Sequence, residues 1–476
     1  MIADNENYDN NNYEFVYSTD HHDNNKRMSR DTIEVMSTLR GEPYWMTEFR
    51  SRSYDTFKNR PTPNWGCDLS KIDFRNIYCH ARTSKKPESV TCSSDRFDTI
   101  NTERRKFLPR AAIQPEYQAA CCKLKENLEK EGVIFVDIKT AIKDYPELVE
   151  KYFGKVIPPE DNKFAALNSA VWSAGSFIYL PPNVKNKVPI HSDYRIDVEN
   201  SRQFERNLII VDEGAELHYV EGCTPPIYAA NIDSLHCAVT ELVAMKSAKI
   251  RYVSIQNGSK DVYKLITQRA YAYEDATVEW INGNIGGRST MNYPSVYMLG
   301  RNSRADIVSF AFAGSGQHQD VGAKAVHIGQ NTASKVTSKS ISKSSGKTTH
   351  RSLIHVENGA KSARVDLHCE ALVLDENSRA DFYPYFKMSE KDAMVLYEGA
   401  VKPVADQLFY LMSRGYTEFD ALSMIVEGFI EPFIKELPLE FSVELPRLLN
   451  LKIQHPTFNH PGNDTKCEGS FSNCFQ

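Results

Sequence analysis

The chain carries ten cysteines, the residues best suited to bind soft metals or to carry sulfur, because a thiolate is both a ligand and a nucleophile. They lie at positions 67, 79, 92, 121, 122, 223, 237, 369, 467 and 474. Their scatter through a long chain without a recognisable export signal favours free thiols over a disulfide framework. No two are spaced as CxxC, so neither a zinc ribbon nor a thioredoxin-like pair is encoded locally. Any metal site must be assembled by the fold or by a partner.

Cys369 lies in the segment VDLHCEALVL, whose alternation is typical of a strand. Successive side chains of a strand point to opposite faces, so His368 and Cys369 are expected on different sides of the sheet. A cysteine buried in a sheet is usually only a small apolar residue, and packing therefore remains the alternative to a role as a ligand.

Two enzyme motifs are incomplete. Ser345 to Thr348 (SGKT) matches the end of a P-loop, but position 341 is Ile341 instead of the leading glycine, and the surroundings are strand-like. The chain also lacks the GxSxG motif of the α/β-hydrolases. We therefore expect neither an ATPase nor a hydrolase of this kind.

The net charge and the hydropathy of the chain exclude further classes of protein. The formal net charge of -5 argues against a general nucleic-acid binder. No apolar run reaches the ~18 residues that a membrane-spanning helix needs. The first fifteen residues are acidic and rich in asparagine, unlike a signal or transit peptide. A cytoplasmic protein that does not enter a membrane is expected.

A repeat of about 30 residues runs through the middle of the chain. A turn with a small residue, followed by alternating apolar positions, recurs at Ala215, Ala248, Ala276, Ala305, Ala333 and Ala363. Short strands at such a period, without helices between them, favour a β-solenoid in which each coil buries its inner face against the next. A β-sandwich is the alternative, although Asn358-Gly359 is the only tight-turn dipeptide at these turns.

Two amphipathic helices are predicted within residues 406 to 440. Gly415 provides a C-cap for the first helix, and Thr417 with Asp420 resembles a capping box at the start of the second. Pro438 marks the end of the pair. On periodicity alone, a buried helical hairpin would account for this segment.

The sequences of several segments resemble those of the SufB/SufD family, the scaffold subunits of the SUF iron-sulfur cluster assembly system. The similar segments include residues 406 to 440, AALNSAVWSAGSFIY from Ala165, FERNLIIVDEGAELHYVEGCTP from Phe204, and EGVIF with PELVEKYFG between Glu131 and Gly154. The segment GEPYWMTEF from Gly41 is closer to SufB than to SufD. Residues 28 to 453 are covered by the resemblance.

The resemblance implies a mainly β fold, with a right-handed parallel β-helix core flanked by N-terminal and C-terminal helical regions. We expect a disordered polar N-terminus over 1-27, a mixed helical region over 28-160 and the β-helix over 161-392. A helical ATPase-docking region over 393-453 and a loose polar tail over 454-476 complete the expected organisation. The role of Cys467 and Cys474 in that tail stays open.

The implied function is that of a non-catalytic scaffold, which works with a SufC-type ATPase and a second SufB/SufD-type subunit as a homodimer or heterodimer. A cysteine desulfurase and a sulfur-transfer protein would deliver sulfur, the iron-sulfur cluster would be bound transiently, and reduced flavin participates in some complexes of the family. The alternative is a SufD-like structural partner without a sulfur-carrying role. A carbohydrate-active β-helix enzyme is a third option, but the region lacks the clustered Asp and Glu that it would need.

The resemblance also implies roles for individual residues. Cys369 and Glu398 match cluster ligands, while Cys223, Arg195 and Gln256 match the sulfur-transfer path. The residues that match the ATPase-docking segment are Asp406, Arg414, Gly415, Met424, Gly428 and Phe429.

Five positions depart from the usual SufB pattern, and the first is Leu396, which replaces a glutamate that is a potential ligand. Tyr397 replaces a histidine ligand, Asp197 replaces an asparagine and Gly258 replaces a tryptophan. Gln268 replaces a lysine, whose loss removes a cation that would favour thiolate and persulfide anions. The replacements therefore affect the expected sulfur-transfer path more than the expected fold.

Overall fold

The computed structural model describes residues 28–74, 77, 130–186, 189–194, 202–223, 234–258 and 260–454. The expected disordered N-terminus over 1-27 and nearly all of the polar tail, with Cys467 and Cys474, lie outside these residues, as do Arg195 and Asp197. At Cys223 only the backbone is described.

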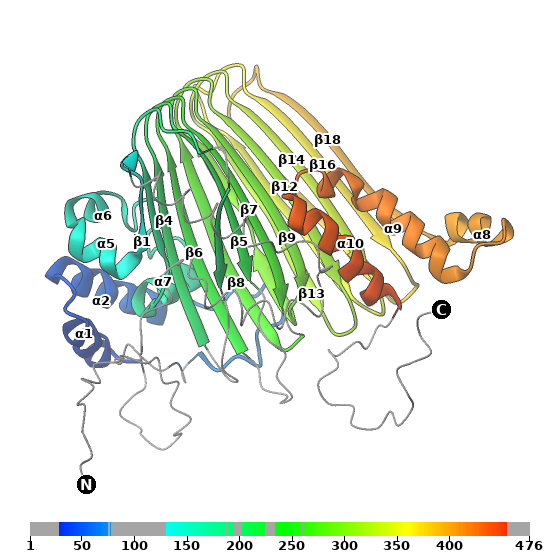
Figure 1. Cartoon of the computed structure of the whole chain (residues 1–476), viewed down its shortest axis with the longest axis horizontal. Helices are drawn as coiled ribbons and strands as arrows, with labels where there is room; N and C mark the ends of the chain where they lie inside the picture. Colours follow the sequence, from blue (N-terminus) through cyan, green and yellow to red (C-terminus); the bar gives the residue numbers. More distant parts are fainter. Residues whose placement is uncertain are drawn as a thin grey trace, which may run out of the picture.

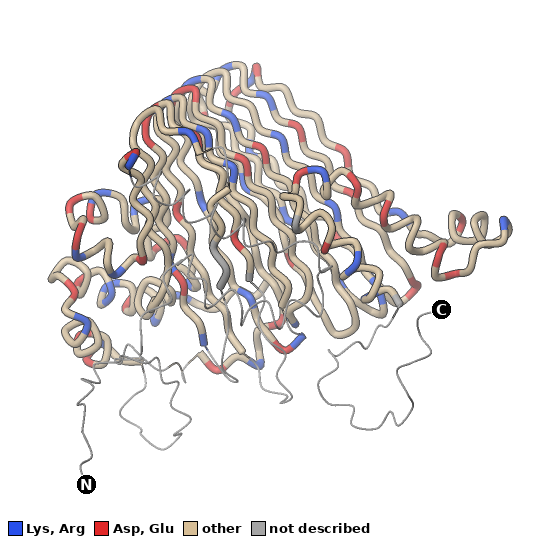
Figure 2. The backbone as a smooth tube through the Cα atoms, in the orientation of Figure 1, with Lys and Arg blue, Asp and Glu red and all other residues tan. Residues whose placement is uncertain are grey.

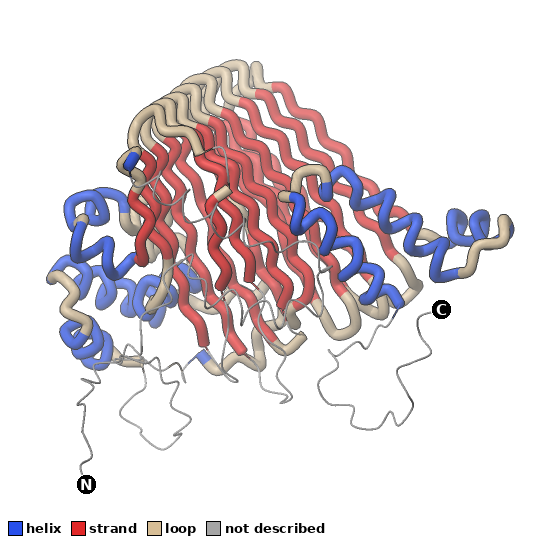
Figure 3. Tube along the Cα trace, viewed as in Figure 1, coloured by secondary structure: helices blue, strands red, loops and turns tan. Residues whose placement is uncertain are grey.

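The core is a parallel β-solenoid built from two facing sheets, which confirms the predicted fold class (Figures 1 and 3). Within each sheet most neighbours are next-but-one strands in sequence, because the chain alternates between the two sheets once per coil. The exceptions are β1 with β2, and the pairs around β10 and β11, which together occupy one position between β8 and β13. All pairs are parallel except β1 with β2. Repeated short strands without intervening helices thus formed coils, and the sandwich alternative is excluded.

The first sheet contains β1 (Ile134–Asp137), β2 (Ser176–Leu180), β4 (Arg202–Val211), β6 (Ser234–Ala244), β8 (Val262–Ala272), β10 (Ser289–Asn292), β11 (Ser295–Met298), β13 (His318–His327), β15 (Lys347–Val356) and β17 (Arg379–Met388). The second contains β3 (Ile190–Tyr194), β5 (Glu216–Cys223), β7 (Lys249–Gly258), β9 (Thr277–Gly286), β12 (Arg304–Ala313), β14 (Ala333–Ser342), β16 (Arg364–Val373) and β18 (Met394–Pro403).

Each coil turns at a residue with a left-handed backbone, which explains the repeat seen in the sequence. The equivalent turn residues have φ between +56° and +61° and are Ser247, Asp275, Asn302, Asn331 and Ser362. Short polar side chains tolerate this conformation because they hydrogen-bond locally. The repeat therefore depends on the turn residue as well as on the small residue near it.

One group of helices precedes the solenoid in the sequence, and a second group follows it. The N-terminal group consists of α1 (Arg30–Leu39), α2 (Tyr44–Asn59), α5 (Ile138–Asp144), α6 (Pro146–Tyr152) and α7 (Lys163–Val171). Its apolar side chains pack with the outer face of the first sheet, where Trp172 and Phe177 are fully buried.

The C-terminal helices are α8 (Ala405–Ser413), α9 (Glu418–Ile434) and α10 (Leu439–Gln454). Thr417 accepts a hydrogen bond from the backbone of Asp420 and caps α9, as the sequence predicts. The buried side of α9 covers the outer face of the second sheet, where the rings of Phe433 and Phe310 lie 5.3 Å apart. Figure 1 shows α8 projecting beyond this contact.

The solenoid runs further than expected. Strand β18 ends at Pro403, eleven residues beyond the predicted limit of 392, and the first C-terminal helix begins at Ala405. The reason is that β16 leaves a free edge whose backbone groups pair with residues 394 to 403. Glu398 consequently lies in a strand and not near a helix start.

Candidate functional site

The inside of the solenoid changes from apolar to polar along each coil. In β7, Ile250 and Tyr252 belong to the apolar core, whereas Ser254 and Gln256 continue the same inward face. Figure 2 shows both signs of charge interspersed along the tube. Charged residues on the surface thus do not single out a site. Buried polar residues do, because burying a polar group without a hydrogen-bond partner costs free energy.

A row of polar side chains crosses the second sheet from strand to strand. Its members are in consecutive register, each is at most 4% exposed, and they are Glu221, Ser254, Asn282, Ser309, Ser338 and Cys369. Five strand spacings separate the ends of this row, or about 24 Å. We call it the thiol row, because it ends at Cys369.

A second row lies on the facing sheet and consists of Gln203, His236, Lys264, Thr290, Gln319 and Thr348. Side chains meet across the interior: Lys264 Nζ is 3.4 Å from Gln256 Oε1, and Thr348 Oγ1 is 3.2 Å from Ser340 Oγ. We call this the facing row. The two rows enclose a polar lane inside the solenoid.

Several buried atoms along this lane have no hydrogen-bond partner among the described residues. They include both ring nitrogens of His350, and His236 Nδ1, Asn282 Oδ1, Thr290 Oγ1 and Gln319 Oε1, whereas His236 Nε2 lies 3.5 Å from Glu205 Oε2. Native proteins satisfy such atoms with water or a polar ligand. The lane is therefore a polar interior in which buried water can satisfy these atoms.

Glu221 lies at the start of the thiol row. It accepts hydrogen bonds from Tyr252 Oη and from Gln256 Nε2, the latter at 3.1 Å. Burial, and secondly the charge of Glu205, raise the pKa of Glu221 to about 8. This carboxyl group is consequently largely protonated at neutral pH.

The expected sulfur-accepting residue, Cys223, pairs in register with Gln256 on β7. Its backbone follows that of Glu221 by two residues on β5. The structure therefore brings the positions of Cys223 and Gln256 together. Arg195, the third residue of the expected path, lies outside the described residues.

Cys369 faces the interior, as alternation predicts, while His368 points outward. The thiol is only 1% exposed, and burial raises its pKa to about 12. Tyr397 lies beside it: the Tyr397 hydroxyl is close to Gly399, which pairs in register with Cys369. In the single chain this thiol is protonated and covered.

Glu398 does not meet Cys369. It pairs in register with His368 on the outer face, where Glu398 Oε2 is 3.2 Å from His368 Nδ1 and Asp366 Oδ1 is 2.7 Å from His368 Nε2. The two expected ligands thus project from opposite faces of the sheet. Within the described residues, no three His, Cys, Asp or Glu side chains are arranged to hold a metal ion.

Cys237 lies on the outer face of β6 under α7, with its Sγ 3.5 Å from the carbonyl oxygen of Phe164. Burial raises its pKa to about 12. The polar lane runs on the opposite face of this strand. Cys237 is a packing residue.

The helical segment expected to bind a partner is unusually exposed. No residue of α8 is buried, and its side chains include Phe409 at 76% and Tyr410 at 55% exposure. Met424 of α9 is also exposed, whereas Phe429 is partly buried beside Lys339. A buried helical hairpin does not describe this segment.

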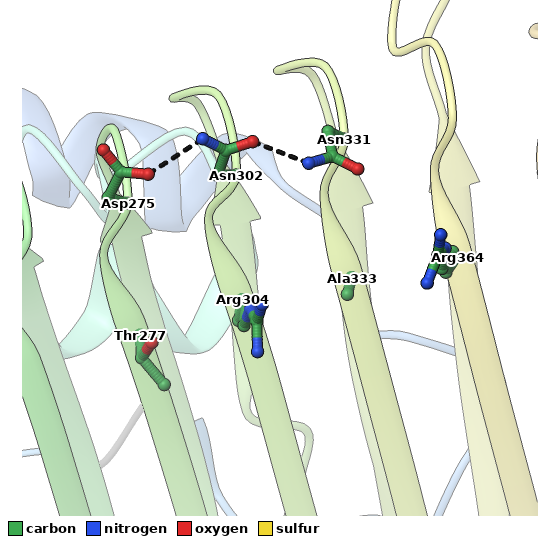
Figure 4. A pocket seen from close by; sticks show the side chains of 7 residues that line it. All are labelled: Asp275, Thr277, Asn302, Arg304, Asn331, Ala333 and Arg364. Atoms are coloured by element: carbon green, nitrogen blue, oxygen red, sulfur yellow. Dashed lines mark hydrogen bonds between the residues drawn. The ribbon is translucent and has the colours of Figure 1, made fainter.

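A shallow hollow of about 580 Å³ lies at the turn edge of the second sheet (Figure 4). Asp275, Asn302 and Asn331 form a hydrogen-bonded ladder along it, and Arg304 and Arg364 flank Ala333 below. It lies outside the solenoid, apart from the lane and from the expected site residues.

Comparison with known proteins defines the class. A model described as "SUF system FeS cluster assembly, SufBD core domain" matches residues 194–429, and "SufBD protein N-terminal region" matches residues 117–191. The "Iron-sulfur cluster assembly protein SufB" of Bacillus subtilis (strain 168) is 44% identical over 436 residues, which cover 90% of this chain and 93% of the relative. An "Iron-sulfur cluster assembly SufBD family protein" of Staphylococcus aureus (strain USA300) is 43% identical over the same shares.

The solenoid and these matches define a SUF-system protein of iron-sulfur cluster assembly. The chain belongs to the SufB/SufD family, and its similarity to the Bacillus subtilis protein makes it SufB-like. The resemblance found in the sequence is thereby confirmed. Among the described residues, no helix has the length and apolar character needed to span a membrane.

Proposed function

We propose that the chain is a non-catalytic scaffold on which sulfur and iron are combined into a nascent iron-sulfur cluster in the cytoplasm. The observation that carries this proposal is the polar lane, which links the Cys223 region at one end of the thiol row with Cys369 at the other. A purely structural solenoid would gain stability by filling this interior with apolar residues.

Sulfur enters at Cys223 in this account. A cysteine desulfurase and a sulfur-transfer protein present a persulfide, and the Cys223 thiolate attacks its outer sulfur. A persulfide forms on Cys223 and the donor leaves as a thiolate. Gln256, with Arg195, orients the sulfur, and reduced flavin would supply the two electrons that release it as sulfide.

Cluster formation takes place at the open end of the solenoid. The inward face of β18 and the outward face of β17 remain uncovered in the single chain: Tyr397 is 41% exposed and Tyr385 62% exposed. A second SufB/SufD-type subunit would cover this end. Moving Tyr397 would open Cys369 to iron, and the partner would contribute the ligands that Glu398 alone does not complete.

A SufC-type ATPase docks on α8 and the exposed side of α9. Phe409, Tyr410 and Met424 supply an apolar surface of the kind that interface cores use. Asp406, Arg414 and Gly415 border it, and Gly428 lies on α9 with open space where a side chain would be. ATP-driven movement of the docked subunit would then reach the solenoid through α9.

The second candidate is a SufD-like structural subunit without a sulfur-carrying role. The burial of Cys369 and the outward position of Glu398 favour it, because the described residues of a single chain present no complete ligand set. The two candidates differ in whether sulfur travels along the lane.

Blocking the lane separates them. Ser338, in the thiol row directly before Cys369, is changed to Leu, with Ser338→Ala as the matched control and Ser309→Val as a smaller second block. The assembled complex is supplied with isotopically labelled sulfur. We expect Ser338→Leu to keep label at Cys223 but to lower label in the cluster about tenfold, while Ser338→Ala stays native. Equal cluster labelling in all three variants would favour the structural role.

A further inference from the structure

Gly258, at the end of β7, lies against Lys264, which leaves no room for a side chain at position 258. A Cβ atom there would lie 2.6 Å from Lys264 Cε and 2.8 Å from Lys264 Nζ, closer than real contacts allow. The strand is extended at this point, so the backbone does not require glycine. The lysine end group of β8 occupies the volume that a larger residue at 258 would fill.

Lys264 brings a cation into the lane. Its side chain is 0% exposed, and its Nζ is 3.4 Å from Gln256 Oε1. Gln256 pairs in register with Cys223 and donates to Glu221. One amide side chain therefore separates the ammonium group from the position at which sulfur is expected to arrive.

Lys264 lies near the carboxyl group of Glu221, because Gln256 contacts both side chains. The titratable groups that act on Glu221 are Glu205, His236 and Tyr252, from β4, β6 and β7. Burial keeps the Glu221 pKa at about 8, so this carboxyl does not bring a full negative charge at neutral pH.

The position of this cation also explains two departures from the usual SufB pattern. Residues 264 and 268 share the inward face of β8 and lie about 13 Å apart along it. The usual lysine at 268 is Gln268 here, which instead accepts a hydrogen bond from Asn282 at 3.2 Å. The usual tryptophan at 258 is absent, and Lys264 fills its place.

We propose that Lys264 stabilises the thiolate and persulfide anions of Cys223, and that Gly258 and Lys264 act as a matched pair that makes this possible. This inference rests on the proposed sulfur-accepting role of Cys223. Lys264 is a positioning and charge-stabilising residue: it helps the Cys223 thiolate form, and that thiolate attacks the outer sulfur of the donor persulfide as described above.

The test measures the Cys223 thiol directly in the full-length protein. Lys264→Met keeps the length of the side chain and removes its charge, and Gln268→Met is the matched control on the same face. Alkylation of Cys223 is followed against pH by peptide mass spectrometry. We expect Lys264→Met to raise the Cys223 pKa by about one unit, which lowers its reactivity about tenfold at neutral pH. Gln268→Met should change neither.

Gly258→Ala provides a second test that does not depend on the stability of Lys264→Met. The added methyl group meets only the flexible end of Lys264 within 3 Å, so it displaces the ammonium group and should raise the Cys223 pKa in the same direction. In the double variant the two effects should not add. An unchanged Cys223 pKa in folded Lys264→Met and Gly258→Ala proteins would overturn the inference. Absence of persulfide on native Cys223, with the pKa shift present, would instead refute the proposed function.

Discussion

At the residue scale, alternation along a strand was a reliable guide to faces. It correctly separated His368 from Cys369, and the same rule applied to β18 would have placed Glu398 beside His368. What the sequence could not supply was the boundary of the strand, because residue 398 fell within the region 393-453 that was expected to be helical. Lys264 was missed for another reason: a lysine in an alternating strand normally points to solvent.

Glu221 makes stability depend on pH. Its pKa is about 8 in the folded protein, against 4.5 ordinarily, so the folded state holds a proton that the unfolded state releases above pH 4.5. Stability should therefore be complete below pH 4.5 and fall as pH rises toward 8. Glu221→Gln should remove this decline, worth on the order of a few kcal/mol, and raise the melting temperature most at pH 8.

The matched control for this prediction is Glu216→Gln. Glu216 lies on the same strand but on the surface, where hydrogen bonds from Lys185 and Lys249 lower its pKa. Its small contribution is present above pH 4.5 and disappears at lower pH. If Glu221→Gln melts with the same pH dependence as the native chain, Glu221 is ionised in the folded protein.

At the scale of elements, the repeat was readable because each coil needs the same turn. The alanines of the sequence repeat do not keep a fixed distance from the left-handed turn residues. Asn302 precedes Ala305 by three positions, whereas Asn331 precedes Ala333 by two. The sequence analysis followed alanines, whereas the left-handed turn residue sets the register of the coil. The extra strand β18 was likewise hidden, because its exposed side chains do not show the alternation of a buried strand.

The helices α8 and α9 have two different faces, and their effects should be separable. Phe409→Asp with Tyr410→Asp changes only exposed rings, so SufC-type ATPase binding should fall at least tenfold while the melting temperature stays unchanged. Phe433→Ala, on the face of α9 that packs on Phe310, should instead cost about 3–5 kcal/mol of stability. Binding would be measured by calorimetry.

Full retention of ATPase binding by the Phe409 and Tyr410 double variant would place the contact elsewhere on the molecule. Removal of all three C-terminal helices is a poorer test. It would expose the apolar outer face of the second sheet, including Phe310, Ile341 and Leu372, and would cause aggregation whatever the docking site.

At the scale of the whole molecule, the thiol row leads to an end that a single chain leaves open. Cys369 is buried under Tyr397, and Glu398 projects from the other face, so these two residues do not form a ligand set within one chain. The sequence could not reveal this arrangement. Cys369 and Glu398 lie on two neighbouring strands, but their side chains project from opposite faces of the sheet. Under the proposed function, we expect the chain to become competent only when a second SufB/SufD-type subunit rearranges the open end.

The central claim is tested most directly by rebuilding the cluster on the assembled complex of this chain, a SufC-type ATPase and a second SufB/SufD-type subunit. Iron and sulfide are supplied without oxygen, and the visible thiolate-to-iron charge-transfer absorption is recorded for the native chain, Cys369→Ala and Cys237→Ala. We predict that Cys369→Ala loses this absorption with unchanged complex assembly, while Cys237→Ala retains it. Equal absorption in the native and Cys369→Ala complexes would contradict the scaffold function.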